Sequence, residues 1–361
     1  MRHTIIQPLT RALLAGIVCV STSMPQQQNI KLETLLSAPF PSSLVAAPAA
    51  GKIAWVQNAK GVRNIWIAEP PEYRGRQLTP YSEDDGQDLS SLSWTPDGKM
   101  IVFVRGGSES RQGEIPNPTS NPAGTEQALW CINIDDGNLR RIGTGSSPAI
   151  SPRGTSVAFL RRGQIYWARL DTVSEAIQLI NARGTAGSLR WSPDGSKLAF
   201  VSSRSDHGFV GVYDLEAKTL RYLDPSVDSD SNPVWSPDGS RIAFMRTPSS
   251  AEPRLFKPER SASPWSIMVA EVATQRTVKV WQADEGRGSA FHNVVAENQL
   301  LWTAGNRIVF PWEKDGWTHL YAIPMNGGKA SLLTPGDFEV EHVSISMDRR
   351  QIFYDSNQGD I

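Results

Sequence analysis

Trp191-Ser-Pro-Asp-Gly195, with Leu198-Ala-Phe200 two residues further on, is the stretch that decides the fold. Proline presets φ, aspartate accepts hydrogen bonds from its own backbone, and glycine tolerates positive φ, so Ser-Pro-Asp-Gly predicts a tight turn. Apolar, β-favouring residues lie on both sides of it. The stretch therefore predicts two antiparallel strands, the first ending at Trp191.

The phrase recurs as Trp94-Thr-Pro-Asp-Gly98, Ser151-Pro-Arg-Gly154 and Trp235-Ser-Pro-Asp-Gly239, each followed by an apolar triplet. The triplets extend further along the chain than the phrase does. They are Ile53-Ala-Trp55, Ile101-Val-Phe103, Val157-Ala-Phe159, Leu198-Ala-Phe200, Ile242-Ala-Phe244, Ile308-Val-Phe310 and Ile352-Phe-Tyr354. Successive starts lie 48, 56, 41, 44, 66 and 44 residues apart, near the roughly 40 to 45 residues of a four-stranded propeller blade.

The repeat therefore predicts an all-β propeller of four-stranded blades over residues 30–361, with seven detectable starts, the last incomplete, and six to eight blades in total. In the unit that begins at Leu189, strands are expected at Lys197 to Ser203, Val210 to Leu215 and Thr219 to Leu223. The recurring phrase residues are assigned to turns and inter-blade packing rather than to catalysis. These structural residues are Trp94, Asp97, Gly98, Trp191, Asp194, Gly195, Trp235, Asp238 and Gly239.

Two long intervals contain polar, proline-bearing stretches, which we interpret as insertions at about 106–124 and 247–264. Insertions of this kind gather on one face of a propeller, where binding usually takes place. Seven residues follow the last triplet, so the last blade lacks outer strands. Either a segment such as Leu44 to Ala47 closes the ring, or the chain is part of something longer.

The amino terminus predicts a secretory signal peptide over residues 1–23, because a short basic region with Arg2 and Arg11 precedes the apolar stretch Ala12 to Val20. Val18 disfavours a lipid anchor at Cys19, because a small residue is wanted there. No segment approaches the roughly 20 apolar residues of a transmembrane helix. We therefore expect export to the periplasm or the extracellular space, with no membrane span.

The 36 basic and 37 acidic residues are spread without long runs of one sign. This pattern excludes the electrostatic footprint of a nucleic-acid-binding protein. Cys131 lies in an apolar run and is expected to be a small core residue.

The sequence contains no recognisable catalytic machinery. It has no Gly-x-Ser-x-Gly elbow of a serine hydrolase. The five histidines show no spacing typical of metal ligands, so neither a metal nor another cofactor is expected. Asp228-Ser-Asp230-Ser-Asn232 begins like a calcium loop, but Pro233 replaces the turn glycine. We interpret this segment as a loop that leads into a blade.

The repeated phrases resemble the PD40 repeat, which occurs in TolB-like propellers and in the amino-terminal domains of prolyl oligopeptidase family serine peptidases. Pro264 to Ala270, Asp315 to Tyr321 and Leu332 to Gly336 resemble the later blades of bacterial dipeptidyl-peptidase-like and acylaminoacyl-peptidase-like enzymes. The resemblance covers about residues 32–361 and favours the peptidase family over TolB.

In that family an α/β-hydrolase domain carries the catalytic serine, aspartate and histidine, and the propeller restricts access to short peptides. The resemblance thus implies a non-catalytic, substrate-gating propeller whose partner is a hydrolase domain, in the same longer chain or separate. The adjacent glutamates with which dipeptidyl peptidases hold the substrate amino group are absent here. The alternative is a stand-alone TolB-like periplasmic propeller that binds another protein.

If the propeller contacts peptide, charged residues in and beside the second insertion are the candidates. They are Arg246, Glu252, Arg254 and Glu259. The competing interpretation is that these charges keep a surface loop soluble.

Overall fold

The computed structural model describes residues 31–33, 37–249 and 263–359. Residues 39–361 form one compact unit, separate from residues 1–38, and the fold described below belongs to this unit. The predicted signal peptide, 1–23, lies outside the described residues. No helix in the described part of the chain has the length and apolar character needed to cross a membrane.

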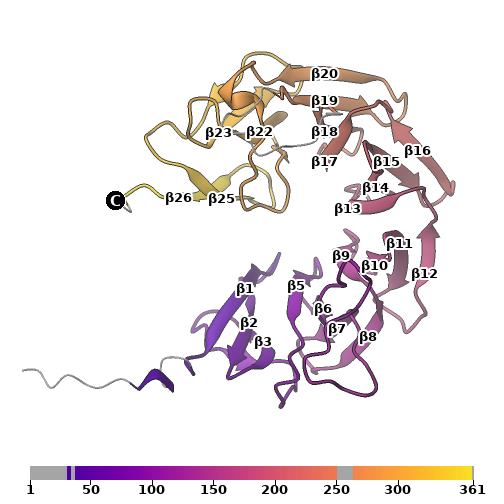
Figure 1. Ribbon diagram of the computed structural model, residues 1–361, viewed down its shortest axis with the longest axis vertical. Coiled ribbons are helices and arrows are strands. Elements are labelled where there is room, and N and C mark those ends of the chain that lie inside the picture. The colour runs from indigo at the N-terminus through magenta and orange to yellow at the C-terminus, as the bar shows by residue number, and fades with distance from the viewer. Residues whose placement is uncertain (1–30, 34–36, 250–262, 360–361) are drawn as a thin grey trace, which may run out of the picture. The chain divides into compact units, whose positions relative to one another are not determined.

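The unit is built from successive antiparallel sheets, which follow one another in chain order (Figure 1). The first sheet contains β1 (Phe40–Ala46), β2 (Ile53–Ala59), β3 (Val62–Ala68) and β4 (Arg76–Gln77). The second contains β5 (Leu89–Trp94), β6 (Met100–Arg105), β7 (Ala128–Asn133) and β8 (Leu139–Thr144). The third contains β9 (Ser146–Ile150), β10 (Ser156–Arg161), β11 (Gln164–Arg169) and β12 (Ile177–Ile180).

The fourth sheet contains β13 (Thr185–Trp191), β14 (Lys197–Ser203), β15 (Gly208–Asp214) and β16 (Thr219–Leu223). The fifth contains β17 (Ser229–Trp235), β18 (Arg241–Thr247), β19 (Ser266–Glu271) and β20 (Thr277–Gln282), and one parallel bridge, Gly208 to Ser229, joins it to the fourth. After the short 3-10 helix η1 (Arg287–Ser289), the sixth contains β21 (Leu301–Trp302), β22 (Arg307–Trp312), β23 (His319–Pro324) and β24 (Ser331–Leu332). A hairpin of β25 (Val340–Ile345) and β26 (Ile352–Ser356) ends the series.

The predicted all-β propeller architecture is confirmed, and every triplet lies in the second strand of its sheet. The strands expected around Leu189 coincide with β14, β15 and β16 to within two residues. The proposal that Leu44 to Ala47 closes the ring is not what the structure shows. β1 pairs with β2 as the first strand of the first sheet, whereas β25 pairs with β26 and forms one isolated bridge, from His342 to Val295.

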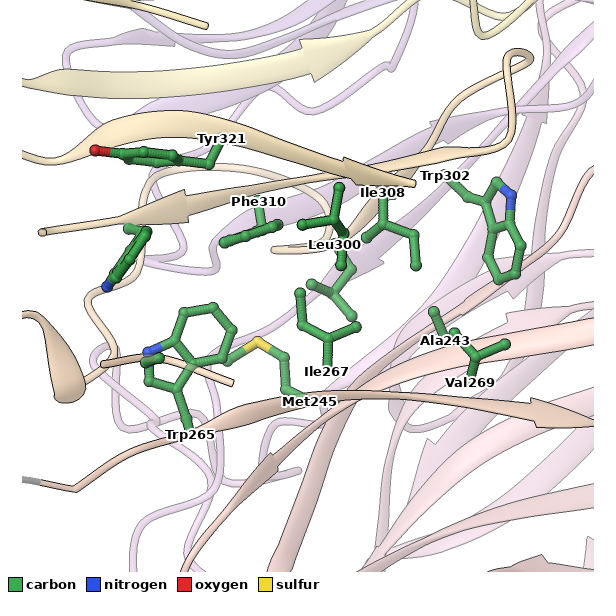
Figure 2. Packing of buried hydrophobic residues seen from close by; sticks show 13 residues of the cluster. Ala243, Met245, Trp265, Ile267, Val269, Leu300, Trp302, Ile308, Phe310 and Tyr321 are labelled. Atoms are coloured by element: carbon green, nitrogen blue, oxygen red, sulfur yellow. The ribbon is translucent and has the colours of Figure 1, made fainter. Parts of the chain in front are cut away.

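The core lies between neighbouring sheets rather than inside each one, because a sheet must bury its apolar faces against another layer. Each of the six buried clusters joins one sheet to the next in chain order. Figure 2 shows the cluster between the fifth and sixth sheets, where Met245 and Ile267 face Phe310, with Trp265 at one side. Cys131 is buried, as predicted.

The phrase tryptophans connect neighbouring sheets by hydrogen bonds as well as by packing. The indole N–H groups of Trp94, Trp191 and Trp235 donate to backbone carbonyls of β1, β9 and β13 respectively, at 3.3, 2.8 and 3.0 Å. Each acceptor strand is the first strand of the preceding sheet. The phrase thus sets both the turn within a sheet and the spacing between sheets.

The turn of the phrase is closed by its serine and aspartate. The Ser236 hydroxyl donates to Asp238 at 2.5 Å and accepts from the Arg241 N–H at 2.9 Å, while the Ser240 N–H donates to Asp238 at 3.1 Å. Gly239 has a φ of 71°, which a side chain would strain. The hydrogen bonds from Ser236 and Ser240 lower the pKa of Asp238 to about 2.

Replacing Asp238 by asparagine should lower the free energy of unfolding by about 1 kcal/mol near neutral pH, because charge-assisted bonds in the turn become neutral ones. The folded-state pKa lies below the ordinary value of 3.8, so this stabilisation is present above about pH 4 and is lost as pH falls through about 2. Urea unfolding at several pH values should therefore show the gap between the two proteins narrowing in acid. Asp135→Asn, at an exposed turn, is the matched control, and a gap independent of pH would contradict the account.

Candidate functional site

The two ends of each sheet differ in character. At the turn end, the first strand passes to the second through a short turn such as 192–196. At the opposite end, here called the insertion end, the second strand passes to the third, and both insertions leave from it, after β6 and after β18. The first strands of successive sheets contact one another, so the insertion ends of neighbouring sheets adjoin. The Ser249 hydroxyl, for example, donates to the Asp206 carbonyl of the fourth sheet at 3.1 Å.

Of the predicted peptide-binding residues, the structure describes Arg246, whereas Glu252, Arg254 and Glu259 lie outside the described residues. Arg246 is in β18, directly before the insertion. Its guanidinium donates to both oxygens of Asp230, at 2.7 and 3.0 Å, and to the side chain and carbonyl of Asp224, at 2.8 and 2.7 Å. Whether Arg246 also meets a peptide stays a prediction.

The interpretation of Asp228 to Asn232 as a loop is wrong for most of the segment, because Ser229–Trp235 is strand β17. The Asp230 side chain is fully buried, and the Arg246 side chain is 11% exposed. Burial raises the pKa of Asp230 to about 6, although the bonds from Arg246 oppose the rise. A buried carboxylate of this kind is tolerated because the guanidinium satisfies both oxygens.

Arg105 occupies the same repeat position as Arg246, four residues after the start of its triplet and directly before an insertion. It forms an ion pair with Asp85, from the loop before β5, and its guanidinium lies 4.6 Å from the centroid of the Tyr81 ring. Both insertions thus begin after an arginine that binds an aspartate of the loop leading into the same sheet, Asp85 for Arg105 and Asp224 for Arg246. This equivalence can be read from the triplet register, but the ion pairs cannot.

Replacing Arg246 by methionine should lower the free energy of unfolding by about 3 to 5 kcal/mol, because Asp230 would be left buried without its counter-ion. The double variant Arg246→Met with Asp230→Asn should recover much of this loss. Arg169→Met removes an exposed ion pair with Asp171 and should leave the free energy of unfolding nearly unchanged, because solvent screens such a pair. If Arg246→Met and Arg169→Met lowered the free energy of unfolding equally in urea, the Arg246 ion pair would not have the stabilising role that its burial implies.

A cavity of about 260 Å³ lies at the insertion end of the second sheet, between the loop before β5 and the first insertion. Its lining is polar throughout and mixes charges with amides and hydroxyls. It includes Asp85, Gln87, Arg105, Thr119, Asn121 and Glu126. This cavity therefore lies beside an insertion, where the sequence predicts the binding face.

A larger cavity, of about 590 Å³, lies at the insertion end of the sixth sheet and the last hairpin. The charged groups of its lining are the carboxylates of Glu313, Glu339 and Glu341, and it includes no lysine or arginine. His292 Nε2 lies 3.1 Å from Glu313 Oε2. Sequence reasoning missed this group, because His292 and Glu313 lie on opposite sides of β21 and β22.

The structure assigns no metal to the described residues. Glu341, His342 and Asp355 are close enough to share an ion, but all three are exposed and His342 Nδ1 bonds Asp355 at 2.9 Å. Such exposed groups are common without an ion.

A repeated feature that sequence reasoning missed is a bulge in the first strand of each of the first five sheets. One residue in each bulge has a φ between 50° and 55°, a conformation that side chains other than glycine seldom adopt. These residues are Ser43, Ser91, Ser147, Ser188 and Asn232. For Ser91, Ser188 and Asn232, a serine or asparagine three residues before the phrase tryptophan is the signal that could have found the bulge.

The comparisons with known proteins agree with this architecture. The family described as the TolB beta propeller domain, PD40, matches residues 145–287. The family described as the dipeptidyl peptidase IV N-terminal region matches residues 259–360. The chain is therefore a propeller related to the amino-terminal propellers of prolyl oligopeptidase family peptidases and to TolB propellers, as the repeats indicated.

Particular solved structures share the fold at low identity. Dipeptidyl peptidase 4 of Porphyromonas gingivalis is 14% identical with a TM-score of 0.62, over 90% of this chain and 51% of that one. A prolyl endopeptidase is 14% identical with a TM-score of 0.60, over 88% and 46%. An oligogalacturonate lyase in complex with manganese is 14% identical with a TM-score of 0.56, over 87% and 85%.

The chain spans about half the length of the two peptidases that it resembles. A comparison with curated protein sequences finds no match. At these identities the likeness establishes the fold, and the activities of the relatives do not follow from it.

Proposed function

We propose that this chain is the substrate-gating propeller of an exported prolyl oligopeptidase-type serine peptidase. The observation that carries the proposal is the match of residues 259–360 to the dipeptidyl peptidase IV N-terminal region. In this account an α/β-hydrolase domain, in the same longer chain or separate, supplies the catalytic serine, aspartate and histidine. The propeller admits short peptides and excludes folded proteins.

The insertion end is the side that we assign to the hydrolase and the substrate. Both insertions leave from this end, and the ion pairs of Arg105 and Arg246 and the two cavities described above lie there. The turn end has cavities too, one lined by Glu69, Glu72 and Arg76 and another by Arg241 and Glu271, but neither insertion leaves from it. Arg246, with Glu252, Arg254 and Glu259 of the second insertion, remains our candidate set for contact with a peptide terminus.

A second function is supported by the match of residues 145–287 to the TolB propeller family. Under this alternative the chain is a stand-alone periplasmic propeller that binds another protein. The predicted signal peptide over residues 1–23 fits both alternatives, because each places the protein outside the cytoplasm.

The two functions differ in whether a reactive serine accompanies the propeller. We expect an antibody against the propeller to capture, from native extract, material that a fluorophosphonate probe labels, in the same polypeptide or a bound one. The 361-residue chain alone should neither take up the probe nor cleave dipeptidyl chromogenic substrates. Captured native protein without any labelled polypeptide would contradict gating and favour the TolB-like alternative.

A further inference from the structure

The 260 Å³ cavity beneath the first insertion is notable because its charges are already paired. Arg105 pairs with Asp85. Glu126 accepts two hydrogen bonds from Arg141, at 2.7 and 2.5 Å, and these bonds hold the pKa of Glu126 below its usual value. A charged ligand group would have to compete with an existing partner for either carboxylate.

What remains for a ligand is a set of neutral hydrogen-bonding groups. Gln87 is 6% exposed, and its Nε2 reaches only the Asp85 carbonyl, at 3.4 Å. Its Oε1 accepts no hydrogen bond from residues that the structure describes, and the hydroxyl of Thr119 makes none with them either. Because most of Gln87 is buried while no described residue fills its acceptor, the carboxamide is held in place and its oxygen can accept a hydrogen bond from a ligand.

The chemistry of these groups matches a peptide group. A carboxamide offers one acceptor and two donors in a plane, which pair with the N–H and C=O of an extended main chain. No aromatic side chain lines the cavity to stack against a sugar ring. The hydroxyls of Thr119 and Thr125 and the amide of Asn121 extend the neutral lining along the insertion.

We infer that this cavity binds an uncharged stretch of peptide main chain, with the Gln87 carboxamide pairing with one peptide group, and that it does not read a charged terminus. The inference rests on the proposed function for its ligand class, since a peptidase gate must contact peptides. It places main-chain recognition on the second sheet, whereas Arg246 belongs to the fifth.

Calorimetry on the 361-residue chain with Ac-Ala-Ala-Pro-Ala-NH2 and its free-amine counterpart tests the inference. We expect the two dissociation constants to agree within about twofold. Gln87→Met should weaken both by about tenfold, the effect of losing one hydrogen bond to the peptide. Thr119→Val, which breaks no internal bond of the described residues, should weaken both by about threefold even if Gln87→Met perturbs folding.

Gln178→Met, at an exposed glutamine of β12, is the matched control and should bind as the unaltered chain does. The inference would be overturned if the chain bound neither peptide or preferred the free amine tenfold. It would also be overturned if Gln87→Met and Gln178→Met had equal effects, or if the chain bound an uncharged trisaccharide in place of the peptides. The fluorophosphonate experiment judges the proposed function separately. If the chain binds the peptides but no labelled polypeptide is captured with it, the inference about the cavity is supported and the proposed gating function is contradicted.

Discussion

The hydrogen bond from the indole of each phrase tryptophan to the first strand of the preceding sheet is the interaction on which the rest of the structure depends. It joins sheets that share almost no backbone pairing, and it lies beside the buried triplets that fill the space between them. Between neighbouring sheets, with or without such a bond, the triplet phenylalanines are fully buried: Phe103, Phe159, Phe200, Phe244 and Phe310. Packing between sheets, rather than within them, gives the unit its order.

The turn and insertion ends follow from the same repeat but serve different purposes. In a Ser-Pro-Asp-Gly turn, serine and aspartate make hydrogen bonds within the turn and glycine takes a positive φ, so few other residues fit these positions. The connection after the second strand carries no such requirement, so insertions and charged residues accumulate there. The Arg105 and Arg246 ion pairs hold the base of each insertion against the sheet from which it leaves.

Sequence reasoning found the sheets because turn chemistry and triplet spacing are local. It also missed a turn at Ser346-Met-Asp-Arg349, where Ser346 and Asp348 form the same bonds although arginine replaces glycine. It placed Asp230 in a loop, because a polar segment that ends at a proline is typical of loops. In the structure Asp230 lies in strand β17, where the ion pair with Arg246 compensates for the burial of its carboxylate. The cavities were beyond its reach, because their lining comes from segments that meet only after folding.

The central claim is that the insertion end is the working face of the propeller. Amide hydrogen exchange, compared between the native protein from its source and the 361-residue chain alone, tests it most directly. The account predicts that contacts in the native protein slow exchange in 85–88, 106–127 and 313–318, while the turns at 95–99, 192–196 and 236–240 exchange alike in both. Slower exchange at those turns, with the insertion end unchanged, would contradict it.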